Sequence, residues 1–328
     1  MKVGLFLLNH FKEDVDPTVV LENLIEQVRV ARDSGFASIW TGEHRLVGPV
    51  QFIAPGQLLP RLITEAGDMT IGTNVIVLPL RHPADVAEEV VTMDLLTGGR
   101  YVLCVSLGYR EEEFDTFGIP LKERASRLTE GVELLRKLMT QDLVTHHGKH
   151  YAVDGLGVGL RPQQSPHPPI WVAAHVDPAV RRAARIGDSW VPPFNASFEL
   201  LERQMPMYRA ELEAAGKPFP SELPLTRECH IGATNAEALE EARGPLGYKY
   251  ESYGGWGLKD TGSGSIFDQL VRESFFIGDP GSVKDQFLRY KEELGFNHMI
   301  CRVQWPGMEQ EKVLNTIRQL GKITSEIG

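Results

Sequence analysis

The sequence predicts an α/β fold with a parallel sheet, organised as one domain over residues 1–328. Short apolar runs alternate with segments of helical periodicity along the chain, and eight of these runs are candidate strands. The strand count and the length favour a sheet closed into a (β/α)8 barrel over an open one, since such barrels commonly have about 250 residues or more. Composition is uniform along the chain, with no break that marks a second domain.

The strands and helices can be placed in order from these patterns. In the first predicted helix, Val20, Leu24, Val28 and Ala31 fall on one face, and Gly35 supplies a stop at its carboxyl end. Helices are also predicted over residues 84–96, 124–140, 178–186, 197–215, 282–294 and 310–327. The candidate strands are the runs VGLFLL, ASIW, TIGTNVIVLPL, YVLCVSLG, PPIWVAA, DSWV, PLTRECHIGA and HMICRVQW.

Two connections are too long for simple loops between a strand and a helix. Residues 141–168 carry glycine and proline signals and are predicted to form an excursion with a small hairpin. Residues 244–265 combine seven glycines with four aromatic residues, which fits a mobile lid that packs on a ligand and excludes water. The same composition fits a poorly ordered surface loop.

Charge and cysteine usage narrow the classes of function. A formal net charge of −10 argues against nucleic acid or an anionic membrane as the main partner, because both select basic surfaces. Cys104, Cys229 and Cys301 are far apart and lie in apolar runs, so they are expected to be reduced core residues of a cytoplasmic protein. The apolar start of the chain is too short for a signal peptide or a membrane span and is predicted to be a strand.

Three histidines in the segment HHGKH raise the question of a metal site. His146, His147 and His150 lie in a polar predicted hairpin without neighbouring carboxylate or cysteine ligands in the sequence. A solvated surface cluster therefore explains them better than a metal ion, and no metal is expected.

Candidate catalytic and binding residues follow predicted strands. Glu43 and His44 come just after the strand that ends near Thr41, where a barrel places its catalytic groups. Histidine titrates near neutral pH and can transfer a proton, although a structural ion pair or hydrogen bond would also explain the pair. The helix that Asp177 opens offers backbone N–H groups to a phosphate, and neither the P-loop nor the Rossmann glycine pattern is present.

Several motifs together resemble the bacterial-luciferase-like flavin-dependent monooxygenase family over nearly the whole chain. They are MKVGLFLL, SIWTGEHR, IGTNVIVLPLRHP, AEEVVTMDLLTGGR, EEEFDTFG, ERASRLTEGVELLRKL, PPIWVAA and IGDPGSVKDQFLRYKEELGF. The resemblance implies a TIM-type barrel and a two-component monooxygenase that takes reduced FMN from a separate flavin reductase. It also implies oxygenation of a small organic substrate with dioxygen through a flavin C4a-peroxide.

The resemblance also implies roles for individual residues. His44 matches the family's active-site histidine, with Glu43 beside it. Asn74 and Val75 match the strand end whose peptide bond is cis in many relatives and lies under the isoalloxazine ring. Ser106 matches the position that borders the reactive carbon of the flavin.

At the phosphate side of the flavin the match is less complete. Ala174, His175 and Val176 match the turn that faces the phosphate. The hydroxyl often found in this turn is replaced by Val176, and the basic phosphate ligand of the fourth strand by Leu107. The luciferases proper have a second histidine where this chain has Arg45, so light emission is not implied.

Two other functions and an assembly state stay open. Related barrels bind the deazaflavin coenzyme F420 and transfer hydride without oxygen, but they tend to have an Asp-His pair where this chain has Glu43-His44, which favours FMN. A non-catalytic flavin-binding barrel is the third possibility. Family members usually pair through helices that here correspond to residues 55–67 and 84–96, so a homodimer is expected.

Overall fold

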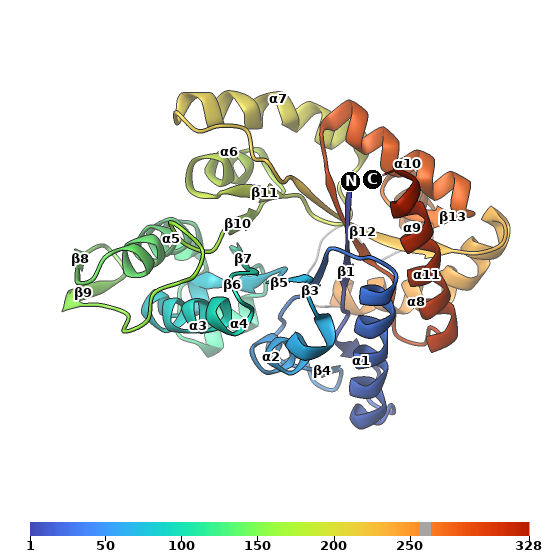
Figure 1. Ribbon diagram of the computed structural model, residues 1–328, viewed down its shortest axis with the longest axis horizontal. Coiled ribbons are helices and arrows are strands. Elements are labelled where there is room, and N and C mark those ends of the chain that lie inside the picture. The colour runs from blue at the N-terminus through green and yellow to red at the C-terminus, as the bar shows by residue number, and fades with distance from the viewer. Residues whose placement is uncertain (256–263, 328) are drawn as a thin grey trace.

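The molecule has the predicted α/β architecture, and its parallel sheet curls on itself (Figure 1). This computed structural model describes residues 1–255 and 264–327. The hydrogen-bonded strand order is β11-β10-β7-β5-β3-β1-β14-β12-β13, and β6 pairs with β7. A hydrogen bond of 2.9 Å from Ser189 Oγ to the Glu222 carbonyl brings the two flanks of the curled sheet together. The strands are β1 (Lys2–Phe6), β3 (Ser38–Thr41), β5 (Thr70–Thr73), β6 (Ile76–Val77), β7 (Tyr101–Ser106), β10 (Ile170–Ala173), β11 (Ser189–Val191), β12 (Pro224–Ile231), β13 (Phe276–Gly278) and β14 (His298–Arg302).

Helices cover the outside of the sheet, and the seven predicted ones are present. Asp16 caps the first helix by accepting from Thr18 N at 2.8 Å, and its predicted apolar face is buried. The other six begin and end within two residues of the predicted bounds. The helices are α1 (Pro17–Asp33), α2 (Pro55–Ala66), α3 (Pro83–Leu96), α4 (Glu111–Thr116), α5 (Arg124–Thr140), α6 (Asp177–Ile186), α7 (Phe198–Ala214), α8 (Asn235–Gly255), α9 (Gly264–Glu273), α10 (Pro280–Leu294) and α11 (Gln310–Ile327), with short 3-10 turns at Leu78–Leu80 and Leu121–Glu123.

A buried polar network closes the amino-terminal end of the sheet. His298 bridges Glu222 and Ser38, with Nδ1 2.5 Å from Glu222 Oε1 and Nε2 2.7 Å from Ser38 Oγ. Trp40 Nε1 donates to the same Ser38 oxygen at 2.7 Å, and the Trp40 ring stacks on Trp171 at 4.8 Å. Each of these polar groups is hydrogen-bonded, as buried polar groups generally are.

The lid predicted over residues 244–265 stays a prediction, but the first half of this segment is a helix and not a loop. Residues 244–255 are helical and form the second half of α8, while residues 256–263 lie outside the described residues. Lys249, Tyr250 and Tyr253 face inward and are buried. Burying these large side chains offsets the roughly 1 kcal/mol that each glycine costs a helix, and this tertiary contribution is invisible in local sequence.

The segment 141–168 contains the predicted small hairpin, formed by β8 (Val144–His147) and β9 (Ala152–Leu156). Its histidines are not the solvated cluster that the sequence suggested. His146 and His150 pack against α5, where His146 Nε2 lies 3.3 Å from Glu130 Oε1 and His150 Nε2 lies 2.7 Å from Ser126 Oγ. Only His147 is exposed, and the described residues contain no group of side chains arranged to hold a metal ion.

Two further expectations concern the cysteines and membrane segments. The three cysteines are buried and free, as predicted. Among the described residues, the helices are each too short or too polar to span a bilayer.

A further short pair of strands, β2 (His10–Phe11) and β4 (Gln51–Phe52), lies antiparallel beyond the carboxyl end of β1.

Candidate active site

Four neighbouring strands bring the predicted site residues to one edge of the sheet. The strands β3, β5, β7 and β10 lie side by side, and all run in the same direction. The segments that follow their carboxyl ends carry the predicted residues, which therefore form one arc although they are far apart in sequence. In strand order these residues are Glu43, His44, Asn74, Val75, Ser106, Ala174, His175 and Val176.

Glu43 is engaged in holding the backbone of this edge. Its Oε1 accepts from Val77 N at 2.7 Å, and its Oε2 lies 3.1 Å from Arg45 Nη2. The Glu43 backbone N–H donates to the Val75 carbonyl at 3.0 Å. Both carboxylate oxygens of this buried side chain are engaged, so the geometry favours a positioning role.

The peptide bond between Asn74 and Val75 is cis, as the family resemblance implies. Asn74 Nδ2 donates to Thr226 Oγ1 at 2.8 Å, which ties the end of β5 to β12 across the interior. Gly42 packs directly against this peptide: a Cβ at that position would lie 2.8 Å from the Asn74 carbonyl oxygen. Residue 42 therefore must be small for the backbone to keep this arrangement.

His44 lies partly buried among aromatic rings. Its ring centroid is 5.6 Å from that of Phe52, 6.2 Å from Tyr109 and 5.7 Å from Tyr253. Burial, followed by the positive charge of Arg110, lowers the pKa of His44 to about 3. The imidazole is therefore neutral near pH 7, with one ring nitrogen that can donate a hydrogen bond and one that can accept one.

The turn predicted to face a phosphate offers backbone groups and no cationic side chain of its own. Ala174 is buried, whereas His175 and Val176 are exposed and precede the first turn of α6. Asp177 at the start of that helix pairs with Arg203, with an Nη1–Oδ2 distance of 2.8 Å. This pairing offsets the negative charge that would otherwise repel a phosphate at the helix amino terminus.

A second group of buried charged residues, which the sequence motifs did not identify, lies near the arc. Glu228 of β12, Lys249 of α8 and Arg302 of β14 are buried together, and Lys249 forms an ion pair with Glu228. Arg302 Nη1 lies 3.3 Å from Glu228 Oε1, and Arg302 Nη2 donates to the Tyr253 hydroxyl at 3.0 Å. Charged residues inside the apolar runs of two predicted strands were the signal that could have identified this group.

His10, also missed, joins the two groups. Its ring centroid lies 5.9 Å from that of Tyr253, which is in turn 5.7 Å from His44. Burial, followed by the charges of Lys249 and Arg302, lowers the pKa of His10 to about 3. The position directly after the first strand was a signal for this residue, because the other candidates occupy the same place on their own strands.

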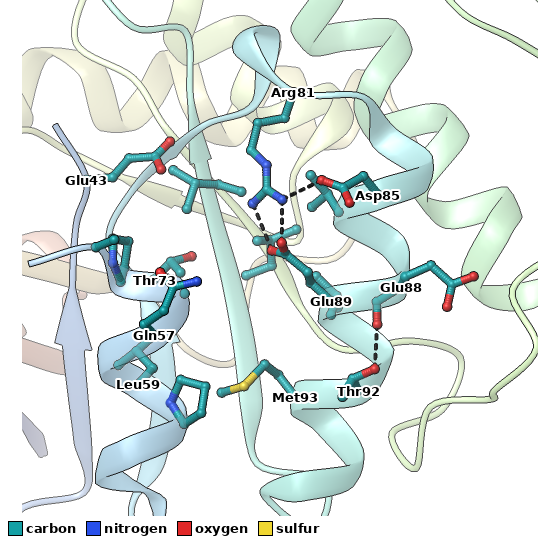
Figure 2. A pocket seen from close by; sticks show the side chains of 18 of the residues that line it. Glu43, Gln57, Leu59, Thr73, Arg81, Asp85, Glu88, Glu89, Thr92 and Met93 are labelled. Carbon is teal, nitrogen blue, oxygen red and sulfur yellow. Dashed lines mark hydrogen bonds and ion pairs between the residues drawn. The ribbon is translucent and has the colours of Figure 1, made fainter. Parts of the chain in front are cut away.

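A groove of about 760 Å³ lies between α2 and α3 on the outside of the sheet (Figure 2). On its α3 side, Arg81 forms ion pairs with Asp85 at 2.7 Å and with Glu89 at 2.5 Å. Leu59 and Met93 contribute apolar walls, and Glu43 borders one end. The groove therefore runs along the helical surface and reaches the arc at one end, where Glu43 and His44 line it.

Comparison with known proteins assigns the chain to a family. The family model for luciferase-like monooxygenases matches residues 1–298. The chain therefore belongs to the luciferase-like monooxygenase family. Its sequence relatives include F420-dependent dehydrogenases and the oxygenase component of a flavin-dependent monooxygenase.

Individual relatives illustrate both kinds of chemistry. An F420-dependent glucose-6-phosphate dehydrogenase of Amycolatopsis mediterranei is 28% identical over 89% of this chain and 91% of its own length. The oxygenase component of a flavin-dependent trigonelline monooxygenase of Acinetobacter baylyi is 25% identical, covering 78% of this chain and 72% of its own. The oxygenating constituent of a Pseudomonas putida 3,6-diketocamphane monooxygenase, solved with FMN, shares the fold with a TM-score of 0.83 at 18% identity, over 99% of this chain and 98% of that one.

Proposed function

We propose that this protein is the oxygenase component of a two-component monooxygenase, which uses reduced FMN and dioxygen to oxygenate a small organic substrate. The observation that carries the proposal is a neutral, partly buried His44 that follows β3, beside Asn74 and Val75 that follow the neighbouring strand β5. Glu43 joins the two by accepting from Val77 N while its own N–H donates to Val75.

The residues of the arc fit a reduced flavin. Ser106 and Ala173 at the ends of β7 and β10 are small and only partly buried, so a planar ring can approach the backbone there. The positive charge of Arg110 beside His44 suits an anionic reduced ring. Reduced FMN, when bound, supplies the two electrons that activate dioxygen.

The side chains of this protein would then control protons and water. In the proposed enzyme His44 is the catalytic residue that holds or moves a proton at its imidazole nitrogens, and Glu43 is its positioning neighbour. The rings of Phe52, Tyr109 and Tyr253 surround His44 and limit the access of water to it.

Binding of three cofactors tests the proposal directly. We expect reduced FMN to bind more tightly than oxidised FMN and than coenzyme F420, because an oxygenase fed by diffusion must capture the reduced form and release the oxidised one. The measurement is an anaerobic titration of each cofactor followed by absorbance, with oxygen then mixed into the reduced complex.

Other outcomes point to other functions. Preferential binding of F420, with no oxygen consumption, would assign hydride transfer, the activity named for the Amycolatopsis relative. Equal affinity for both flavin forms, with no oxygen-dependent change beyond that of free flavin, would indicate a non-catalytic flavin-binding protein.

The proposal includes a flavin reductase as partner, a homodimer as the assembly and the cytoplasm as the compartment. Buried free cysteines support a reducing compartment. The groove between α2 and α3 lies on the helices expected to pair and supplies both apolar walls and the Arg81 ion pairs. Light scattering at micromolar concentration should give twice the chain mass of 36.6 kDa, and a monomer would contradict the homodimer.

A further inference from the structure

Charge is unbalanced in the buried group formed by Glu228, Lys249 and Arg302. Both oxygens of Glu228 are in use, since Oε1 faces the two cations and Oε2 accepts from Trp305 Nε1 at 2.5 Å. One carboxylate therefore faces two cationic side chains, all of them nearly or fully buried. A buried charge without a counter-charge is costly, so this imbalance needs a physical explanation.

The lysine is the member of the group that can remove the imbalance. Burial, followed by the charge of Arg302, lowers the pKa of Lys249 to about 7, even though Glu228 favours its charged form. Near neutral pH the group can therefore lose its excess charge by releasing the Lys249 proton. A bound anion would reverse this, because it would stabilise the ammonium form.

The group faces the site and not the exterior. Arg302 lies between the rings of Phe6 and Phe194, at 4.7 and 4.3 Å from the ring centroids, which fixes the plane of its guanidinium. Its partner Tyr253 lies beside both His10 and His44. Arg302 Nε is buried and has no hydrogen-bond partner among the described residues.

Arg227, on the neighbouring strand β12, shows why the position of Arg302 matters. It is also buried with a similarly unpartnered Nε, but its terminal nitrogens donate to the carbonyls of Pro193 and Ala196 at 3.2 and 2.8 Å. It also contacts Tyr290 of α10, on the helical side of the sheet. An arginine nitrogen without a hydrogen-bond partner is thus not enough to indicate a binding site. What indicates a binding site at Arg302 is the excess of positive charge beside His44, the proposed catalytic histidine.

We infer that Arg302 and Lys249 form an anion subsite, held in place by Glu228, that binds an acidic group of the substrate, such as a carboxylate or sulfonate. The inference rests on the proposed function, because it names the class of substrate for that same site. It adds that the organic substrate is an anion, with its acidic group directed towards β14 and α8.

Binding of small anions tests the subsite without flavin, oxygen or turnover. The probes are acetate and methanesulfonate, and acetamide is the neutral match for acetate. We expect calorimetry at pH 7 to detect both anions but not acetamide. Repeating the titration in buffers of different ionisation enthalpy should reveal proton uptake, and affinity should fall by up to about tenfold per pH unit above pH 7.

Lys249 is the group expected to titrate in this range. Burial keeps the hydroxyls of Tyr250 and Tyr253 neutral by raising their pKa values, and the lowered pKa values of His10 and His44 keep both rings neutral. The cations Arg302 and Lys249 lower the pKa of Glu228 despite its burial, and Glu228 in turn raises that of Arg302, so both stay charged.

Variants separate this subsite from the flavin site. Arg302→Gln and Lys249→Met should each weaken anion binding at least about tenfold, while the affinity for reduced FMN changes less than about threefold. Arg318→Gln on α11, which removes an exposed pair with Glu311, is the matched control and should bind anions as the wild type does.

Three results would overturn the inference: undetectable binding of both anions by the wild type, binding without proton uptake, or unchanged anion affinity in the variants with loss of reduced FMN binding. If Arg302→Gln fails to fold, as its melting curve would show, Lys249→Met and the pH dependence of the wild type decide. A wild type that binds anions as expected but fails the cofactor titration keeps the subsite and rejects only the monooxygenase.

Discussion

Two buried histidine networks lie at opposite ends of the curled sheet and are built from similar residues. At the amino-terminal end His298 is held between Glu222 and Ser38, and the Trp40–Trp171 stack covers it. At the carboxyl end His44 and His10 lie beside Tyr253 and the charged group around Arg302. Both ends contain a carboxylate, an imidazole and a basic side chain, but Lys2 at the amino-terminal end is exposed, whereas Lys249 and Arg302 are buried.

The two networks differ in how their charges are matched. Glu222 has two basic partners, His298 and Lys2, but Lys2 is exposed, so water screens its charge and no buried cation is left without a counter-charge. The neighbouring polar groups are hydrogen-bonded, as in a network that only stabilises the fold. At the carboxyl end positive charge exceeds negative charge, and both histidines are kept neutral. A buried histidine is therefore weak evidence for catalysis by itself. The balance of charge around a buried histidine distinguishes one that stabilises the fold from one that takes part in a functional site.

Replacing each histidine with alanine should give opposite results, and His44 should give the larger effect. We expect His44→Ala to lower product formation by about 10²–10⁴-fold, which is the usual contribution of general acid–base catalysis, with little change in melting temperature. Reduced flavin should still be oxidised, but with hydrogen peroxide released in place of oxygenated product.

The matched variant is His298→Ala. It leaves Glu222 and Ser38 without a shared partner, so it should cost roughly 1–3 kcal/mol of stability, and activity should follow the folded fraction. The measurements are melting temperature and the ratio of peroxide to product for both proteins. A destabilised His44→Ala protein that still couples oxygen to product normally would remove the distinction between the two ends.

Most of the fold could be predicted from the sequence, because helical periodicity and strand composition are local. The last helix, Gln310–Ile327, has the predicted bounds, since its apolar face repeats without interruption. The second half of α8 was missed for the opposite reason. Its glycines predict a loop, and only burial of Lys249, Tyr250 and Tyr253 against the sheet makes it a helix.

The candidate site likewise contains residues that local sequence patterns identify and residues that they do not. His44 and Asn74 could be located because each follows its own strand within a family motif. Glu228, Lys249 and Arg302 come from three segments, and what they form is a property of their charges together. No local pattern contains that information, although a charged residue inside an apolar strand is a signal that two of them share.

The smallest effect predicted here concerns Glu222 and acid. Burial alone would raise the pKa of Glu222, but its hydrogen bond to His298 and the charges of His298 and Lys2 lower it to about 2, from an ordinary value of 4.5. A carboxyl whose pKa is depressed by folding contributes stability above its unfolded pKa and loses it as the pH falls towards the folded value. The wild type should therefore lose about 2 kcal/mol from this group between pH 4.5 and about 2, allowing for its partial exposure.

Glu222→Gln isolates this contribution, because glutamine keeps the shape but carries no charge. The difference in unfolding free energy between wild type and variant should be largest at pH 5–7 and should shrink steadily below about pH 4.5, as followed by urea unfolding at each pH. Glu133→Gln, which removes an exposed pair with Lys137 on α5, controls for general loss of carboxylates and should show a small difference at every pH. A difference for Glu222→Gln that stays constant down to pH 2 would mean that His298 does not depend on this charge. The amino-terminal network would then be held by packing alone, and balanced charge would no longer separate it from the carboxyl end.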